Sequence, residues 1–249
     1  MKYTKLKFKS SSTKPHDFIG SKIRGVLGYA LKEEVCINPS FKCENCFALK
    51  DCIFYKFYEQ KNITHKYRLD FELRSDKFEF AFLLFGDAIK HKDEIKTALL
   101  KSLKEYQDVV CEEESLIFAS NDYSSIVKLE FLTPLRMKKD NKFVKDSIDL
   151  IDILVSINRR YYELTGEDFE RLNVSKDYNI ITKHLNYKEL TRKSNTQKTK
   201  MNLGGVMGDM VITNIDKKSY ELLKLGEVIG VGKSTVFGLG KIRVEGFNG

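Results

Sequence analysis

Near its C-terminus the chain carries a glycine-rich segment that only a tightly folded loop can accommodate. Residues 230–240 read Gly-Val-Gly-Lys-Ser-Thr-Val-Phe-Gly-Leu-Gly, so two pairs of glycines bracket a short polar and basic run. Glycine has no Cβ and tolerates positive φ, which lets such a loop turn sharply and bring backbone N–H groups close to an anion. The alternating residues that follow, 241–245, predict a strand. We therefore interpret the segment as a phosphate-contacting loop that leads into a strand.

The same loop contains Gly232-Lys233-Ser234, the last three positions of the nucleotide-triphosphate motif G-x-x-x-x-G-K-[ST]. The first position of that motif is occupied by Glu227 instead of glycine, and residues 217–228 before the loop have the spacing of a helix. The motif requires a strand, then the loop, then a helix, and this chain offers the reverse order. The sequence therefore argues against an ATPase.

Length and composition set broad limits on the protein. A chain of 249 residues with 42% hydrophobic content can bury a substantial core in one large domain or two smaller ones. No uninterrupted apolar run is long enough to span a bilayer, and the N-terminus lacks the apolar core of a signal peptide. We therefore expect a soluble, cytoplasmic protein. The formal net charge of +8 favours polyanionic partners, although many ordinary proteins are basic.

Hydrophobic periodicity predicts the same element order, βαββαβ, in each half of the chain. In the first half we expect strands at 2–10, 67–73, 78–85 and 115–119, and helices at 18–34 and 88–106. In the second half we expect a strand at 125–131, a helix at 146–164, one or two strands within 179–215, a helix at 217–228 and a strand at 239–244. The predicted fold is α+β, with two tandem ferredoxin-like (RRM-like) domains. The first covers residues 1–122 with a cysteine-rich insert at 36–52, and the second covers 123–249 with the glycine-rich loop.

Four of the five cysteines are clustered as Cys36-x6-Cys43-x2-Cys46-x5-Cys52. Two thiolates separated by two residues can bind one metal ion from a single turn, and the outer pair can complete a tetrahedron around Zn²⁺. The spacing is not a standard paired-knuckle pattern, so a structural zinc, a disulfide and simply reduced cysteines all remain open. Cys111 reads as an ordinary packed thiol.

Residues 183–201 form a second basic segment, with six lysine or arginine residues against one acidic residue, Glu189. The segment also carries Tyr187 and a run of hydroxyl and amide side chains at 194–197. Basic and amide groups interleaved with an aromatic ring suit single-stranded or hairpin RNA better than a duplex groove. A solvated loop explains the same composition equally well.

Taken together, these stretches resemble the CRISPR-associated endoribonucleases that process precursor crRNA, within the RAMP superfamily, and specifically the branch with a cysteine-bearing first domain. The resemblance covers nearly the whole chain, and the matching stretches occur in order: Gly20 to Leu31, the four cysteines, Leu84-Phe85-Gly86, Phe131 to Arg136, Asn158-Arg159-Arg160, Arg192 to Gln197, Leu203 to Gly208 and the closing glycine loop.

The resemblance implies a metal-independent endoribonuclease that cleaves CRISPR repeat RNA in precursor crRNA. In such enzymes a ribose 2′-OH attacks the neighbouring phosphate and leaves a 2′,3′-cyclic phosphate and a 5′-OH. No cofactor is expected for catalysis. The implied partners are repeat RNA and subunits of a CRISPR effector complex, with no membrane. The RNA-binding residues we predict are Lys22, Arg24, Arg192, Lys193, Gln197, Gly230, Gly232, Lys233, Ser234, Gly238 and Gly240.

The reaction needs a base for the 2′-OH and an acid for the leaving 5′-oxygen, and histidine suits both because its ordinary pKa lies near neutral pH. The chain has four histidines: His16, His65, His91 and His184. His16 is the first candidate because it precedes the family-like segment that begins at Gly20, in the region where the family places its acid/base. His184 is the second because it lies in the basic segment, and catalysis by tyrosine or lysine stays open. His91 is expected in solvent.

Two other classes of protein fit parts of the pattern. A non-catalytic RAMP subunit would use the same fold and loop to hold crRNA in an effector complex. A zinc-dependent DNA-binding regulator would use the cysteine module to recognise DNA bases. The cysteines here lack the base-contacting helix that a zinc finger requires.

Overall fold

The computed structural model describes residues 1–14, 19–139, 141–146, 148–194 and 199–247, with backbone alone for 191–194 and 199–201. It divides into two compact units, Lys2–Ile117 and Phe118–Gly249, and Met1 belongs to the second. Among the described residues, no helix combines the length and the apolar character that crossing a bilayer requires.

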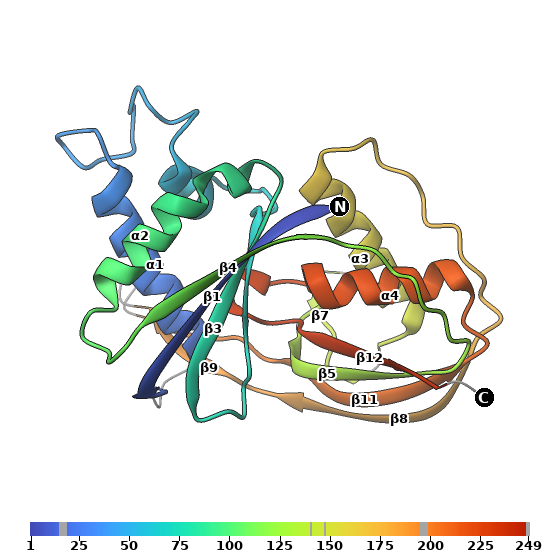
Figure 1. The fold of residues 1–249 in the computed structure, drawn as a ribbon. Coiled ribbons are helices and arrows are strands. Elements are labelled where there is room, and N and C mark those ends of the chain that lie inside the picture. The colour runs from blue at the N-terminus through green and yellow to red at the C-terminus, as the bar shows by residue number, and fades with distance from the viewer. Residues whose placement is uncertain (15–18, 140, 147, 195–198, 248–249) are drawn as a thin grey trace. The chain divides into compact units, whose positions relative to one another are not determined.

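The N-terminal unit is a four-stranded antiparallel sheet with two helices (Figure 1). Its strands run in the order β2-β3-β1-β4, which is the ferredoxin-like arrangement. The long β1 alternates as a half-buried strand should, with Thr4, Leu6 and Phe8 buried between exposed or half-buried neighbours. The elements are β1 (Lys2–Thr13), α1 (Ile19–Val35), β2 (Tyr67–Phe71), β3 (Lys77–Phe85), α2 (Lys92–Ser102) and β4 (Val110–Ile117).

The C-terminal unit repeats this plan with the strand order β12-β5-β11-β8. Two small hairpins are added to it, β6–β7 between β5 and α3 and β9–β10 between β8 and β11. The elements are β5 (Val127–Leu135), β6 (Lys138–Lys139), β7 (Lys142–Phe143), α3 (Leu150–Thr165), β8 (Asn179–Lys188), β9 (Thr191–Ser194), β10 (Thr199–Asn202), β11 (Gly205–Thr213), α4 (Lys217–Ile229) and β12 (Ile242–Gly246). The predicted pair of ferredoxin-like domains is confirmed.

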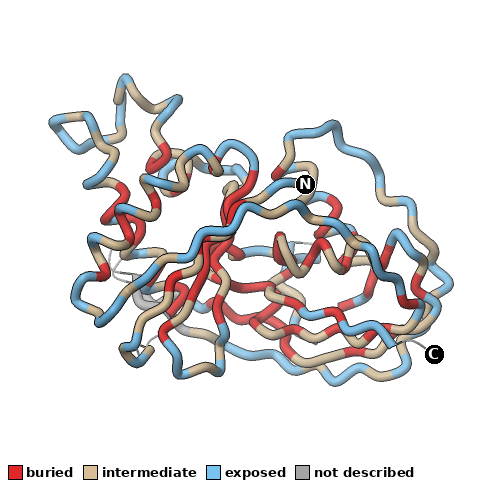
Figure 2. Tube along the Cα trace, viewed as in Figure 1, coloured by how far each residue is buried: buried red, intermediate tan, exposed pale blue. Residues whose placement is uncertain are grey.

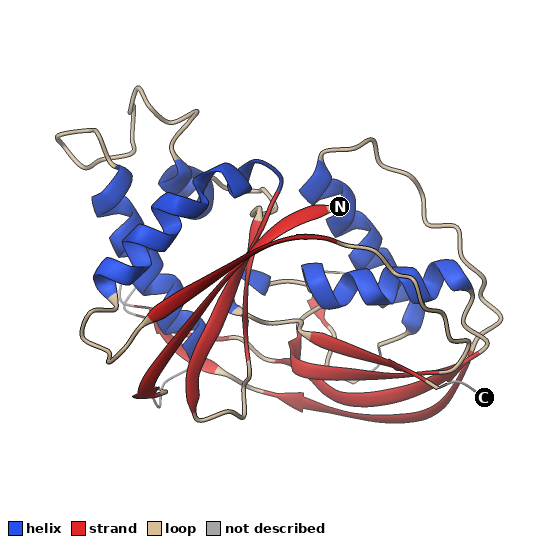
Figure 3. Ribbon diagram, viewed as in Figure 1, coloured by secondary structure: helices blue, strands red, loops and turns tan. Residues whose placement is uncertain are grey.

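In the C-terminal unit the two helices lie on one face of the sheet, as Figure 3 shows. Leu129 and Phe131 on β5 and Met210 on β11 are apolar and buried. Figure 2 shows buried residues alternating with less buried ones along the strands of this sheet. Their neighbours along the strands, Lys128 and Glu130, point to the opposite face and are only partly buried. Alternation on the strands therefore separates an apolar core face from a charged outer face.

Several predicted elements differ from the observed ones. The stretch 179–215, expected to hold one or two strands, holds four, β8 to β11, and the helix expected at 146–164 begins at Leu150. The helix expected at 88–106 begins as a 3-10 helix, Gly86–His91, and becomes α-helical only at Lys92. The strand expected at 115–119 begins at Val110 and pairs with β1 from Val110 to Ile117. Residues 112–114 are all glutamate and all exposed on this edge strand, and such a run conceals the strand from a hydrophobic pattern.

Asp216 caps α4, the helix that leads into the glycine-rich loop. Its carboxylate accepts hydrogen bonds from the Ser219 N–H at 2.9 Å, the Ser219 hydroxyl at 2.9 Å and the Ser175 N–H at 2.8 Å. Burial alone would raise the pKa of Asp216, but these hydrogen bonds together hold it below the ordinary 3.8. The cap therefore stabilises the fold above the ordinary carboxyl pKa, and this contribution is lost as the pH falls through the lowered value.

We predict that Asp216→Ala lowers the free energy of unfolding by about 1–2 kcal/mol at neutral pH, because the first turn of α4 loses its cap. Asp216→Asn keeps one acceptor and should lose less. Urea titrations of the three proteins at neutral pH and below pH 4 measure both effects. Equal midpoints for Asp216→Ala and the wild type at neutral pH would contradict the assignment.

Candidate nucleic-acid interface

The glycine-rich loop joins α4 to β12 through a path that requires glycine. The backbone φ is positive at Gly230, Gly232, Gly238 and Gly240, with values of 70–78°, and at Ser234, with 66°. A Cβ on Gly240 would lie 1.8 Å from the carbonyl oxygen of Val231, and one on Gly232 would lie 2.6 Å from that of Arg136. These contacts are too close for any other residue, so the glycines set the shape of the loop.

The loop is fastened to the end of β5 by its own backbone. Gly240 donates its N–H to the Pro134 carbonyl at 3.1 Å, and Lys233 donates to the Arg136 carbonyl at 2.8 Å. Gly232 donates to the Ser156 hydroxyl on α3 at 3.0 Å. Most loop N–H groups therefore serve the fold, and the glycines themselves have few donors to offer an anion.

The groups that the loop can offer to a phosphate lie at its tip. Within the described part of the chain, the N–H groups of Ser234, Thr235 and Val236 donate to no other protein group. The Lys233 side chain is exposed and forms no ion pair with a described residue. Phosphate contact by the loop stays a prediction, and the groups that could make it are the Lys233 side chain and the N–H groups of Ser234, Thr235 and Val236.

Arg136 connects the loop to the second predicted RNA-binding segment. Its guanidinium donates to the carbonyl of Asn202 at 2.9 Å and to that of Gly204 at 3.4 Å, at the junction of β10 and β11. Its carbonyl accepts from Lys233, as described above. Two segments about thirty residues apart in the sequence are therefore joined at one end of the C-terminal sheet. Sequence reasoning included Arg136 in a family-like stretch but gave it no role.

The basic segment is mostly an edge strand and a hairpin. β8 pairs with β11 along its whole length, and β9 pairs with β10. Arg192 and Lys193 lie on β9, and Gln197 lies outside the described residues. Tyr187, at the end of β8, has its pKa raised by burial and then by the neighbouring Glu189 carboxylate, so its hydroxyl stays protonated at neutral pH.

The two basic residues predicted on α1 belong to the N-terminal unit. The Lys22 ammonium lies 5.7 Å from the centre of the Tyr106 ring. The Arg24 guanidinium lies 4.5 Å from the centre of the Tyr58 ring and donates to the carbonyl of Phe57 at 3.3 Å. The contacts of Arg24 fasten α1 to the segment that follows the cysteine insert, so its structural role is clear, and its contact with RNA remains a prediction.

The histidines occupy different surroundings. His16, the first candidate for the acid/base, lies outside the described residues. His65 Nδ1 lies 3.2 Å from the carbonyl oxygen of Lys56. The expectation that His91 lies in solvent is wrong, because its side chain is 15% exposed and its Nδ1 lies 3.2 Å from Glu94 Oε1. The turn of 3-10 helix before α2 rotates this position toward the protein.

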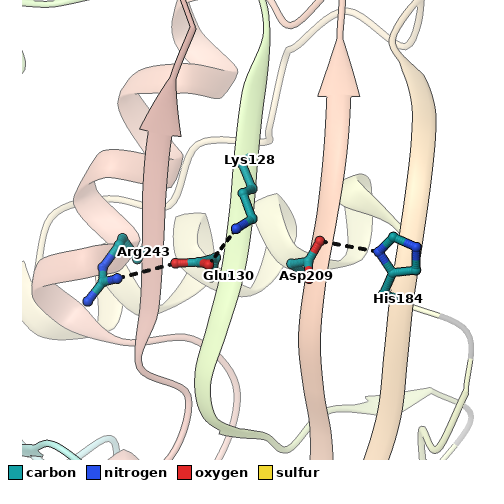
Figure 4. Close-up of polar contacts among 5 residues, drawn as sticks. All are labelled: Lys128, Glu130, His184, Asp209 and Arg243. Carbon is teal, nitrogen blue, oxygen red and sulfur yellow. Dashed lines mark hydrogen bonds and ion pairs between the residues drawn. The ribbon is translucent and has the colours of Figure 1, made fainter.

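His184 lies on the outer face of the C-terminal sheet, in a row of charged side chains across the strands (Figure 4). Its Nδ1 is 3.5 Å from Asp209 Oδ2, and its side chain is 74% exposed. Lys128 and Arg243 both pair with Glu130, at 2.8 Å and 3.4 Å. Two carboxylates therefore face two permanent cations, which compensates the charge of the row.

Asp209 is a residue that sequence reasoning missed. It faces His184 across β8 and β11, a relation that appears only when the register of the two strands is known. A carboxylate at Nδ1 can orient a histidine and leave Nε2 for proton transfer. His184 lies four residues along β8 from Lys188, which pairs with Gly205 near Arg136. At about 3.4 Å per residue, roughly 13 Å separates the two positions.

All four clustered cysteines line one cavity of about 210 Å³ in the N-terminal unit, together with His91 and Glu94. Their thiols are free, and none of the described residues forms a group of three or more Cys, His, Asp or Glu side chains placed to hold a metal ion. Burial raises the pKa of Cys43, and the neighbouring Cys52 and Cys36 raise it further. The four cysteines thus lie close together, but the described residues do not arrange them as the ligands of one metal ion.

Burial raises the pKa of Cys111 to about 11, which fits a packed and unreactive thiol.

Comparisons with known proteins show which family the C-terminal half of the chain resembles. Residues 129–242 match the family model of the CRISPR-associated endoribonuclease Cas6, and residues 1–106 match a model described as an N-terminal domain. The comparison with curated protein sequences gives no match.

Solved structures with the same fold include a product complex of the Thermus thermophilus Cas6 (TTHB231), which has a TM-score of 0.65 and 13% identity over 98% of this chain and 99% of that one. A product complex of Cas6 (TTHA0078) has a TM-score of 0.55 and 15% identity over 98% and 100%. An RAMP protein that binds different RNA substrates has a TM-score of 0.53 and 12% identity over 98% and 100%. At such identities the likeness shows the fold. The match of residues 129–242 and this shared fold make the chain similar to the CRISPR-associated endoribonucleases of the Cas6 type.

The structural zinc predicted from the cysteine spacing is tested by elemental analysis of protein purified under reducing conditions. The prediction expects one zinc per chain, and it expects Cys43→Ser to lose the metal and unfold at a lower temperature than Cys111→Ser, its matched control. A protein that contains no metal and has four titratable thiols in this insert in the native state would contradict it.

Proposed function

We propose that the protein cleaves CRISPR repeat RNA within precursor crRNA by attack of a ribose 2′-OH on the neighbouring phosphate. The 2′-oxygen forms a bond to phosphorus, and the bond from phosphorus to the 5′-oxygen breaks. A base takes the 2′-OH proton, and an acid supplies a proton to the leaving 5′-oxygen. The products are a 2′,3′-cyclic phosphate and a 5′-OH, and no step requires a metal ion.

The observation that carries this proposal is the connection made by Arg136. It places the exposed Lys233 of the glycine-rich loop beside the β10–β11 junction, so that two segments suited to RNA meet at one end of the sheet. Cations and N–H donors held in a fixed arrangement can bind the phosphate and stabilise the charge that develops on the phosphorane. The outer-face row that contains His184 offers no comparable excess of positive charge, because its carboxylates and permanent cations balance.

The acid/base is proposed to be His16, with His184 as the second candidate. The Asp209 carboxylate gives His184 an orienting partner, which supports a role in proton transfer. Its estimated distance of roughly 13 Å from the strand end near Arg136 weakens that role, because an acid/base must lie within hydrogen-bond reach of the proton that it moves.

The proposal also includes transfer of the product RNA to subunits of a CRISPR effector complex, which copurification from the host would test.

We predict that Lys233→Ala weakens binding of the host repeat RNA and lowers the slope of log Kd against log salt by roughly 0.7–0.9, because one phosphate contact is lost. Gly238→Val should weaken binding further, since φ is 78° there and the loop itself would be distorted. Fluorescence anisotropy at several salt concentrations measures both effects.

Lys217→Ala is the matched control, because Lys217 is an exposed lysine at the other end of α4. It should bind RNA with the wild-type slope. Wild-type affinity and slope in both Lys233→Ala and Gly238→Val would rule out the loop as an RNA contact.

The mechanism predicts that His16→Ala slows single-turnover cleavage by roughly 10²-fold or more, the usual scale for losing a general acid/base, while RNA binding stays near wild type. A repeat RNA with a 2′-deoxy substitution at the cleavage position should bind and remain intact, because its nucleophile is absent. Cleavage of the all-ribose RNA should continue in EDTA. Gel analysis of end-labelled RNA gives all three results.

Wild-type cleavage by His16→Ala together with an inactive His184→Ala would move the acid/base to the His184–Asp209 pair. Loss of cleavage in EDTA would contradict the metal-independent mechanism. Binding without cleavage of any repeat RNA by the wild type would favour the alternative in which the protein is a non-catalytic RAMP subunit that holds crRNA.

A further inference from the structure

The segment from Arg136 to Lys145 is a third concentration of positive charge in the C-terminal unit. It contains five basic residues and one acidic residue, and its centre folds into the β6–β7 hairpin. Lys138 pairs with Phe143 and Lys139 pairs with Lys142 across that hairpin. Surface lysines are ordinarily compensated by nearby carboxylates. The acidic partners of these lysines therefore show whether their charge is available to a binding partner.

The structure supplies few acidic partners for these lysines. Lys139 alone forms an ion pair with a described residue, Asp152, at 3.6 Å. Lys138, Lys142 and Lys145 are exposed and pair with no described carboxylate. Exposed cations without an acidic partner among the described residues favour a polyanionic partner over a solvated surface of mixed charge.

Aromatic rings lie among the cations. The Arg136 guanidinium is 3.8 Å from the centre of the Phe143 ring, and the Lys138 ammonium is 5.1 Å from it. The Lys145 ammonium is 5.7 Å from the centre of the Tyr187 ring, which belongs to β8. Rings beside uncompensated cations suit single-stranded nucleic acid, because phosphates meet the cations and bases can stack against the rings.

The hairpin is also continuous with the interface described above. Arg136 contacts Phe143 with its guanidinium, donates to Asn202 and accepts from the Lys233 N–H with its carbonyl. The hairpin, the glycine-rich loop and the β10–β11 junction therefore all contact Arg136. An RNA strand bound by Lys233 would have the hairpin lysines beside it.

We propose that Lys138, Lys142 and Lys145 form an additional RNA contact that binds single-stranded phosphates flanking the segment held by the glycine-rich loop. This inference rests on the proposed RNA function and extends it to a segment that the sequence pattern did not single out. Its contribution is electrostatic and independent of base sequence.

The test compares the triple variant Lys138→Ala/Lys142→Ala/Lys145→Ala with the wild type in binding a fluorescein-labelled oligouridylate. The triple variant should bind at least tenfold more weakly at low salt, and its slope of log Kd against log salt should fall by about 2, at roughly 0.7 per lost single-strand contact. The triple arginine variant at the same positions keeps the charge and should keep the wild-type slope.

The double variant Lys217→Ala/Lys218→Ala is the control for net charge. These exposed lysines begin α4, whereas the glycine-rich loop follows its last residue, about 20 Å away along the helix axis. The control should keep most of the wild-type affinity. Thermal unfolding should be unchanged in the triple variant, because its three side chains are exposed.

Three results would overturn the inference. The triple variant could keep the wild-type slope, or the Lys217/Lys218 control could lose as much affinity as the triple variant. Polyglutamate could also compete with oligouridylate as effectively as unlabelled RNA of the same length does, which would indicate an acidic protein partner. If the wild type itself fails to bind RNA of any kind, the proposed function fails first and the hairpin contact fails with it.

Discussion

Two backbone hydrogen bonds from the glycine-rich loop to the end of β5 hold together the surface that is proposed to bind RNA. Gly240 donates to Pro134 and Lys233 donates to Arg136, and both require a loop path on which a Cβ cannot be accommodated. The glycines therefore act mainly through conformation. They place Lys233 and Ser234 at an exposed tip, and the side chains at that tip are what RNA would meet.

The distribution of charge separates two parts of the C-terminal unit that look similar in sequence. On the outer face of the sheet, Glu130 and Asp209 balance Lys128 and Arg243, so the row has little net attraction for phosphate. Near the end of β5, Lys138, Lys142, Lys145 and Lys233 pair with no carboxylate in the part of the chain that the structure describes. The net charge of +8 is thus less informative than the position of the cations that lack acidic partners.

Much of the fold could be predicted from the sequence, because the apolar residues of each half recur with the period of its strands and helices. The glycine loop also marks the connection between the last helix and the last strand. Relations that depend on strand register could not be predicted. Asp209 faces His184 only through the pairing of β8 with β11, and Arg136 reaches Asn202 only through the pairing that closes the β10–β11 junction. The β6–β7 hairpin was missed because strands of two residues carry no periodic signal. The cysteine spacing correctly indicated neighbours in space, but thiol proximity alone does not specify ligand geometry.

The central claim is that RNA binds at the end of the C-terminal sheet where Arg136 joins the three basic segments. Photocrosslinking of repeat RNA that contains 4-thiouridine, followed by mass spectrometry of the crosslinked peptides, tests it most directly. The account predicts crosslinks within residues 136–145, 187–204 and 230–240. Crosslinks confined to peptides around Lys128, His184 and Arg243, with none in those three segments, would contradict it.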